Sequence, residues 1–234
     1  MLTRRQFCGC LPLAATFVAS NAFAVGLDCA VFTPERQRAL SPDEAIERLK
    51  QGNDRFLAGT SFNCDLLAQV HESAHGQAPF AAILGCIDSR VPPELVFDQR
   101  IGDVFCARIA GNFVDTDVLG SLEFATKVTG ARAIVVLGHS SCGAVKGAID
   151  DVKLGNITAM LANIRPAVDA VKTDGERTSK NSKFVQAVAE ENVRRNIAQL
   201  TERSEVLAGL VKEGQLRIVG AMNDLETGKV TFMA

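Results

Sequence analysis

Two cysteines and a histidine carry the clearest chemistry in the sequence. Cys86 lies in the segment GCIDSR, and His139 and Cys142 lie in GHSSCG, much further along the chain. Two thiolates and an imidazole suit zinc, and a catalytic zinc site uses three protein ligands with a fourth position open. Because the segments are far apart, they do not form a zinc finger. The residues predict a zinc site assembled from two separate elements.

Asp88 and Arg90 follow the first cysteine within the same segment. Side chains two residues apart in an extended segment lie on the same side, so the guanidinium can hold the carboxylate in a charge-assisted pair. An aspartate kept ionised in this way can orient a water molecule at a metal. The alternative for Asp88 and Arg90 is a surface ion pair. The alternative for the candidate ligands is that Cys86 and Cys142 are buried free thiols and that His139 is a capping residue.

A second motif, HESAH at residues 71–75, matches the H-E-x-x-H pattern of zinc proteases. Those enzymes need the motif on a longer helix and a third ligand downstream. Gly76 and Pro79 end any helix directly after the motif, and the only other histidine is His139. We interpret the motif as the solvated final turn of a helix that leads to Gln77. Its two histidines, His71 and His75, at most help to move protons.

The elements that must position these residues alternate between strands and helices. Continuous apolar runs predict buried strands at residues 79–86, 103–111 and 131–139, and two further strands within 215–233. Helical spacing predicts helices at residues 41–59, 117–130, 143–153 and 181–204. This order predicts an α/β fold with a mostly parallel central sheet of four strands plus a C-terminal antiparallel strand, and helices on both faces. Ligands in such folds gather at the carboxyl ends of strands, where Cys86 and His139 lie.

Composition and the first residues indicate the number of domains, the absence of a nucleic-acid partner and an export signal. The chain has 234 residues, 47% of them hydrophobic, which suits one domain with a substantial core. A net charge of -2 with interspersed signs gives no basic stripe for nucleic acid, so we expect no nucleic-acid partner. Arg4 and Arg5, a short apolar run and the small residues at 22–24 resemble a twin-arginine export signal.

This N-terminal pattern predicts a signal peptide at residues 1–24. For the rest of the chain, we predict an irregular arm at 25–40 and a single zinc domain at 41–234. We therefore expect a periplasmic protein, exported by the twin-arginine route, without stable membrane insertion after signal cleavage. The alternative is an N-terminal anchor that is never cut.

Five of the seven cysteines remain after signal removal, and this odd number does not indicate a disulfide framework. An oxidising periplasm permits a bridge between Cys29 and Cys64, but nothing in the sequence requires it. Cys106, in an apolar run, is most simply a small buried hydrophobe.

The motifs CIDSRV and HSSCG, with GDVFCARIAGN between them, resemble the beta class of carbonic anhydrase, whose core motifs are C-x-D-S-R and H-x-x-C. The resemblance extends from RLKQGNDRF to IVGAMNDLETGKV. It implies one zinc ion per subunit, held by Cys86, His139 and Cys142. It also implies Asp88 and Arg90 as the orienting pair, with Asp88 as a conditional fourth ligand.

The same resemblance implies the surroundings of the metal. Gln77 and Phe105 match residues that line the carbon dioxide pocket, and Gly143 matches a backbone amide that positions substrate. Family members pair so that one subunit completes the other's pocket, which predicts a homodimer or tetramer. One subclass builds a noncatalytic bicarbonate site from Trp and Tyr and locks the aspartate onto zinc. This chain has neither residue type, so we expect the open form.

The implied activity is that of a carbonate dehydratase, a zinc lyase that reversibly hydrates carbon dioxide to bicarbonate and a proton. Two thiolates make zinc a weaker Lewis acid than three histidines do, so we expect activity that rises into mildly alkaline pH. The first alternative is hydrolysis of carbonyl sulfide or carbon disulfide at the same site. The others are a zinc protease and a noncatalytic zinc-stabilised binding module.

Overall fold

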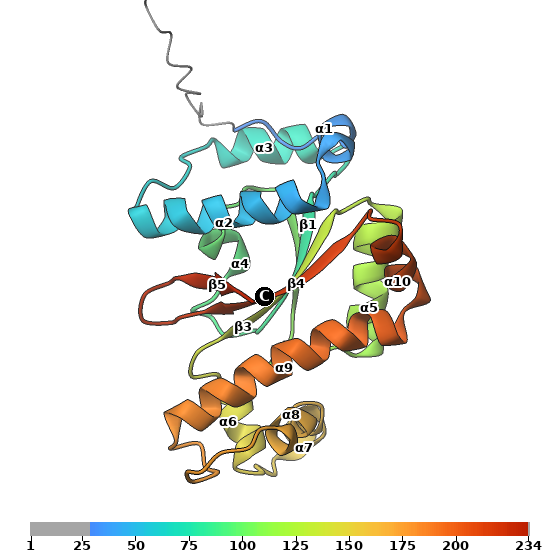
Figure 1. Ribbon diagram of the computed structural model, residues 1–234. Helices are drawn as coiled ribbons and strands as arrows, with labels where there is room; N and C mark the ends of the chain where they lie inside the picture. Colours follow the sequence, from blue (N-terminus) through green and yellow to red (C-terminus); the bar gives the residue numbers. More distant parts are fainter. Residues whose placement is uncertain (1–28, 234) are drawn as a thin grey trace, which may run out of the picture.

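A single sheet forms the centre of the computed structural model, which describes residues 29–233 (Figure 1). Its strands are β1 (Ala81–Gly85), β2 (Val104–Arg108), β3 (Ala133–His139), β4 (Arg217–Asn223) and β5 (Val230–Phe232). They lie in the order β2-β1-β3-β4-β5; the first four are parallel and β5 is antiparallel to β4. The predicted fold class is confirmed. The predicted signal peptide lies outside the described residues.

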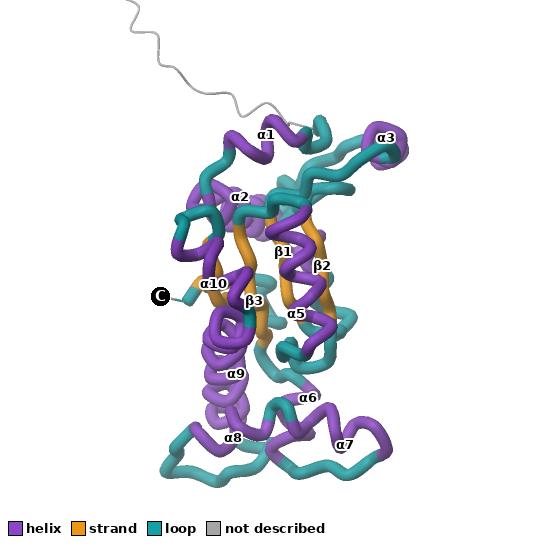
Figure 2. The backbone as a smooth tube through the Cα atoms, turned by 90° about the vertical axis from the view of Figure 1, so that its right-hand side faces the viewer, coloured by secondary structure: helices purple, strands orange, loops and turns teal. Residues whose placement is uncertain are grey.

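Helices cover both faces of the sheet (Figures 1 and 2). They are α1 (Pro34–Ala39), α2 (Pro42–Ala58), α3 (Leu66–Ser73), α4 (Pro93–Val96), α5 (Thr116–Glu123) with the π-helical η1 (Phe124–Val128), α6 (Gly143–Ile149), α7 (Gly155–Ala162), α8 (Arg165–Ala170), α9 (Ser182–Arg203) and α10 (Glu205–Lys212). Alternate strand residues face two apolar clusters, one formed with α2 and α4, the other with α5 to α10. Figure 2 shows α1 and α3 at one end of the sheet and α6, α7 and α8 at the other.

Local signals fix the longer helices where the sequence predicts them. Ser41 and Glu44 form a reciprocal capping box at the start of α2, and Gly59 ends that helix in the left-handed conformation. Asn181 caps α9 by accepting a hydrogen bond from the backbone of Phe184.

The expectation of an irregular arm over residues 25–40 is wrong for residues 34–39, which form α1. Thr33 caps this short helix, and Pro34 is its first residue. The buried Gln37 side chain donates to Pro79 O at 2.7 Å and to Thr129 O at 2.9 Å. Contacts with distant segments therefore hold a helix too short to show an apolar period in the sequence.

A disulfide between Cys29 and Cys64 joins the arm to the segment before α3. Among the described cysteines, Cys86, Cys106 and Cys142 are free. Gln69, the one buried residue of α3, donates from Nε2 to Cys29 O at 3.1 Å. The bridge and this hydrogen bond together fasten the arm to α3.

Removing the disulfide is expected to lower the free energy of unfolding by about 2–4 kcal/mol, because the cross-link restricts the unfolded chain. Thermal and urea unfolding of the Cys29→Ser/Cys64→Ser variant will measure the change, with Cys106→Ser as the control for losing a thiol. The same unfolding midpoint in both variants would contradict the expectation.

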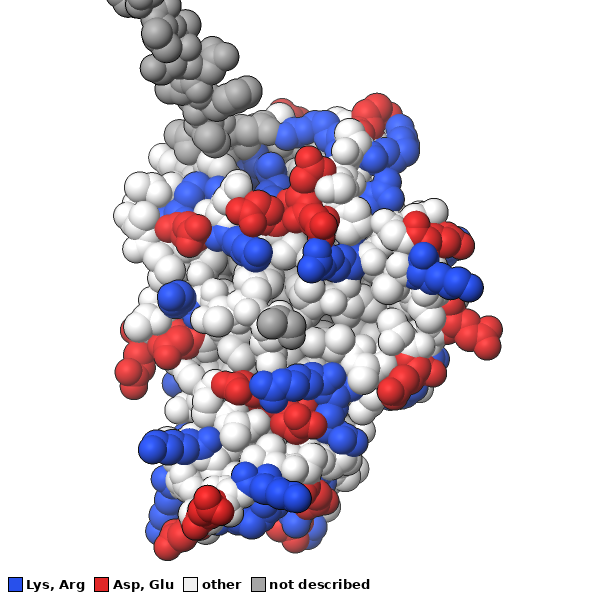
Figure 3. Space-filling view, in the orientation of Figure 1, with Lys and Arg blue, Asp and Glu red and all other residues white. Residues whose placement is uncertain are grey.

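Charges of both signs are mixed over the face in Figure 3. None of the helices between residues 29 and 233 is long and apolar enough to cross a membrane.

Candidate metal centre

The carboxyl ends of the neighbouring parallel strands β1 and β3 bring the predicted zinc ligands together. Cys86 directly follows β1, His139 is the last residue of β3, and Cys142 directly precedes α6. All three are buried, and one donor atom from each lies within 4.8 Å of the others. A tetrahedral zinc ion holds such donors about 3.5–3.8 Å apart, so a small adjustment of side chains accommodates it.

Hydrogen bonding directs the His139 ring toward a metal. Its Nδ1 lies 2.9 Å from the carbonyl oxygen of Ser140, which can only accept, so Nδ1 carries the proton. The other nitrogen, Nε2, is buried and has no hydrogen-bond partner. A buried nitrogen with a free lone pair beside two thiols fits zinc coordination.

Of the two thiols, that of Cys86 is the one prepared to carry negative charge. The Cys142 thiol hydrogen-bonds Cys86 and lowers its pKa, and His139 and the backbone N–H groups of Gly111 and Asp88 act in the same direction. The same contact, together with burial, raises the pKa of Cys142. The metal-free pair therefore shares a proton, which metal binding would release.

Asp88 and Arg90 form the pair that the sequence predicts, at the edge of the cluster. Arg90 Nε donates to Oδ1 at 2.9 Å and Nη2 donates to Oδ2 at 2.7 Å. These hydrogen bonds hold the pKa of Asp88 well below its usual range. Asp88 Oδ2 also lies 3.9 Å from His139 Nε2, so an ionised carboxylate stands beside the metal position.

Arg108 is a site residue that the sequence interpretation missed. From the end of β2, its Nε donates to Cys86 O at 2.8 Å and its Nη2 donates to Asp88 O at 2.6 Å. It thus fixes the backbone between a metal ligand and the aspartate. The available signal was an arginine at the end of an otherwise apolar strand.

Two predicted pocket residues lie away from the metal cluster of their own chain. The exposed Gln77 precedes β1 while Cys86 follows it, and this strand spans about 16 Å at about 3.3 Å per residue. Phe105 lies near the start of β2, with its ring centroid 6.4 Å from that of Phe124. Their pocket role stays a prediction and requires a second chain. Gly143, by contrast, directly follows a ligand as the first residue of α6, where helix N–H groups lack intrahelical partners.

The HESAH motif lies at the amino end of the sheet, not beside the metal cluster. His71, Glu72 and Ser73 form the last turn of α3, and the first two are exposed. This agrees with the solvated helical turn that the sequence predicts. Because α3 and α6 lie at opposite ends of the sheet (Figures 1 and 2), these histidines cannot move protons at the metal site of their own chain.

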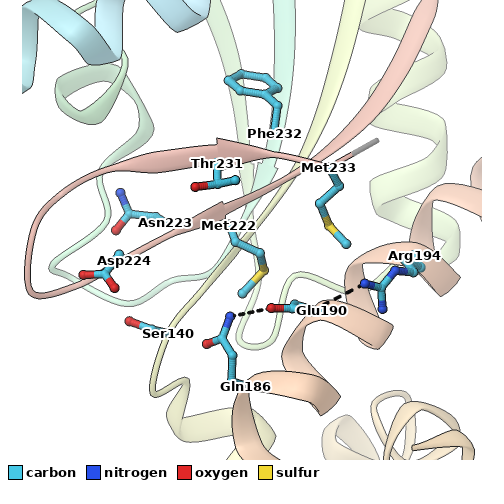
Figure 4. A pocket seen from close by; sticks show the side chains of 10 residues that line it. All are labelled: Ser140, Gln186, Glu190, Arg194, Met222, Asn223, Asp224, Thr231, Phe232 and Met233. Atoms are coloured by element: carbon cyan, nitrogen blue, oxygen red, sulfur yellow. Dashed lines mark hydrogen bonds and ion pairs between the residues drawn. The ribbon is translucent and has the colours of Figure 1, made fainter. Parts of the chain in front are cut away.

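A separate cavity of about 500 Å³ lies between α9 and strands β4 and β5 (Figure 4). Within it, Gln186 Nε2 donates to Glu190 Oε1 at 3.0 Å, and Arg194 Nη2 lies 3.5 Å from Glu190 Oε2. These polar groups pair with one another, and no predicted metal ligand lines the cavity, so we assign it no ligand. Its lining residues are Ser140, Gln186, Glu190, Arg194, Met222, Asn223, Asp224, Thr231, Phe232 and Met233.

Comparison with known proteins agrees with this geometry. The family model for carbonic anhydrase matches residues 81–230. Carbonic anhydrase 2 of Mycobacterium tuberculosis is 38% identical over 201 residues, which cover 82% of this chain and 93% of the relative. The Coccomyxa beta-carbonic anhydrase solved with acetazolamide is 28% identical, with a TM-score of 0.63 over 70% of this chain and 75% of that one. One of two tetrameric beta-carbonic anhydrases from Sordaria macrospora is 25% identical, with a TM-score of 0.61 over 71% and 90%. With its ligand cluster at the carboxyl ends of β1 and β3, the chain belongs to the beta class of the carbonic anhydrase family.

Proposed function

We propose that the protein catalyses the zinc-dependent, reversible hydration of carbon dioxide to bicarbonate and a proton. The observation that carries the proposal is the buried cluster of Cys86, His139 and Cys142 with the Asp88 carboxylate beside it. A bound zinc ion would supply the Lewis acid that lowers the pKa of water enough for it to lose a proton near neutral pH, and the deprotonated form is the nucleophile that attacks carbon dioxide. Zinc, one ion per subunit, is thus the proposed cofactor.

The chain's own residues orient the reactants. The Asp88 carboxylate accepts a hydrogen bond from the attacking water and turns its lone pair toward the carbon atom of the substrate. Arg90 keeps that carboxylate in place from one side, and Arg108 fixes its backbone from the other. In this proposal, the backbone N–H of Gly143 hydrogen-bonds an oxygen of the substrate or product. Asp88 remains a conditional fourth ligand, which the pairing with Arg90 disfavours.

Zinc analysis combined with a carbon dioxide hydration assay on the purified mature protein tests the function. We expect one zinc ion per subunit and hydration activity that is lost on chelation. Hydrolysis of carbonyl sulfide and carbon disulfide, measured in parallel, tests the second candidate substrates, which the same ligands could serve. Hydration no faster than the uncatalysed rate in zinc-loaded protein would overturn the proposal.

Activity is expected to rise from neutral into mildly alkaline pH, because two thiolates weaken the Lewis acid. Asp88 contributes no inflection there, since its pKa is lowered and the carboxylate is ionised throughout. Even an unpaired aspartate, with a pKa of about 3.9, would be ionised at neutral pH. Arg90→Met should therefore lower kcat by about 10- to 100-fold through misorientation, without moving the midpoint of the pH profile.

Initial rates across the pH range will measure both quantities. The control is Arg38→Met, which breaks an exposed ion pair with Glu35 away from the site. A midpoint that moves in Arg90→Met alone would show that Arg90 acts on ionisation rather than on orientation.

Exposed apolar surfaces support assembly with a second copy of the chain, as a homodimer or tetramer. Within residues 29–233, no strand pairs with the outer edge of β2, and with α5 and η1 this edge borders a groove of about 670 Å³ that includes Phe105 and the half-exposed Phe124. On α3, Leu66, Leu67 and Val70 are 56%, 72% and 45% exposed. Light scattering of the active species tests the proposal, which a monomer would overturn.

Mixing two inactive variants tests whether Gln77 serves the site of a partner subunit. Gln77→Ala and Asp88→Ala homo-oligomers should each have low activity. After subunit exchange, each mixed dimer has one site with both residues intact, so about a quarter of all sites should recover. No recovery despite exchange confirmed by mass spectrometry would place Gln77 outside the partner's site.

Export to the periplasm by the twin-arginine route accounts for the N-terminal sequence and for a disulfide at Cys29–Cys64, since such bridges persist in oxidising compartments. No stable insertion in the membrane is then expected after cleavage of residues 1–24. Cell fractionation of the wild type and of an Arg4→Lys/Arg5→Lys variant tests the route: the variant should accumulate as an uncleaved precursor. Unchanged export of the variant would exclude it.

A further inference from the structure

We propose that Asn192 is a positioning residue for the metal site and acts on Cys86 through the backbone of Gly111. Asn192 lies in the middle of α9, and Gly111 lies in the loop after β2. Gly111 N donates to Cys86 Sγ at 3.3 Å, and Asn192 Nδ2 donates to Gly111 O at 2.8 Å. The inference rests on the zinc site proposed above and adds to it a residue outside the ligand cluster.

The loop after β2 carries the Gly111 N–H group that contacts the sulfur, and its conformation depends on a glycine. Gly111 has φ +84°, and a Cβ there would lie 2.3 Å from Ile164 Cδ1, so the position requires glycine. Glycine also has the greatest backbone freedom. The peptide group after Gly111 is held by two hydrogen bonds: Asn112 N donates to Ile109 O at 2.9 Å, and Asn192 binds the carbonyl of Gly111. Because this group is joined through the Gly111 Cα to the group that carries the Gly111 N–H, holding it restricts where that N–H points.

The Asn192 side chain is itself held in one orientation. Asn196, one helical turn later, donates from Nδ2 to Asn192 O at 2.7 Å and to Asn192 Oδ1 at 3.2 Å. Asn196 Oδ1 in turn accepts from Val114 N at 2.7 Å. Both asparagines are 2% exposed, and burying two amides is costly unless such bonds are made. The network thus links α9 rigidly to the loop that contacts the ligand.

An N–H group that donates to a thiolate sulfur draws negative charge away from it, so the sulfur donates fewer electrons to the metal. This matters in a site with two thiolates, because each thiolate reduces the Lewis acidity of zinc. By fixing the Gly111 N–H, Asn192 keeps the zinc more acidic and restrains Cys86 as a ligand.

The variant Asn192→Leu, which keeps the side-chain shape but removes the amide oxygen and nitrogen, tests the inference against a merely structural role. The matched control is Gln37→Met at the opposite end of the sheet. Gln37 is 4% exposed and also donates to backbone carbonyls, those of Pro79 and Thr129. Each protein is loaded with cobalt for absorption spectra and with zinc for transfer to a chelator.

In Asn192→Leu, the thiolate-to-cobalt charge-transfer band should move to longer wavelength, because an unbonded sulfur lone pair gives up an electron more easily. Zinc should reach the chelator about 10-fold faster than from the wild type, because the loss of the restraint on Cys86 as a ligand outweighs the stronger electron donation from its sulfur. Gln37→Met should lose thermal stability, yet keep the wild-type spectrum and rate of zinc release.

A wild-type spectrum and release rate in Asn192→Leu would overturn the inference alone, as would equal changes in both variants. A wild-type protein that takes up no cobalt would overturn the zinc site itself. If Asn192→Leu does not fold, Asn192→Ala replaces it, with the same expected changes and the same overturning results.

Discussion

Replacing Cys142 by serine is expected to leave the purified protein without zinc and without measurable hydration of carbon dioxide. A serine hydroxyl does not ionise near neutral pH, so only Cys86 and His139 would remain as strong ligands. The loss should affect both quantities together, because the proposed activity depends on the metal. Elemental analysis after extensive dialysis, followed by the hydration assay, will measure them.

The matched control is Cys106→Ser, the substitution of the free thiol on β2 that is not part of the ligand cluster. This variant should keep both zinc and activity. Retention of full zinc content by Cys142→Ser would overturn the ligand assignment, whatever its effect on the rate.

Substituting Asp88 by alanine is expected to lower kcat by about 10²- to 10⁴-fold while the protein keeps its zinc. The three ligands are untouched by this change, whereas the group that orients the attacking water is removed. The combination of full metal content and low activity separates an orienting role from a ligand role. It also separates the enzyme from a noncatalytic zinc-binding module, in which the substitution would change no rate.

Asp169→Ala is the control for losing an aspartate paired with an arginine, since Asp169 accepts from exposed Arg165 at 3.2 Å on α8. It should have wild-type activity and zinc. Wild-type activity in Asp88→Ala would exclude Asp88 from the mechanism, and loss of zinc would make it a permanent ligand.

The strands and the ligand cluster were predictable because their signals are local. Each buried strand is a continuous apolar run, and the parallel arrangement brings the residues that follow β1 and β3 to one end of the sheet. Cys86 and His139 were therefore expected at the same edge of the sheet, whereas the strand order that makes β1 and β3 neighbours comes from the structure. The pairing of Asp88 with Arg90 followed from their spacing.

Features that depend on distant contacts were not predictable. The hydrogen bonds of Gln37 that hold α1 join segments far apart in the sequence. An odd number of cysteines left the pairing of Cys29 with Cys64 open. The resemblance supplied Gln77 as a pocket residue. Only the direction of β1 shows that Gln77 lies at the end of the sheet opposite to the metal ligands of its own chain.

The disulfide also changes the covalent topology of the chain. Cys29 and Cys64, 35 residues apart, close a ring that contains α1 and α2. Cutting any single peptide bond inside this ring leaves both new ends attached to the rest of the protein. A protease that nicks a loop there cannot release a fragment, and α2 stays tethered to the sheet face that it covers.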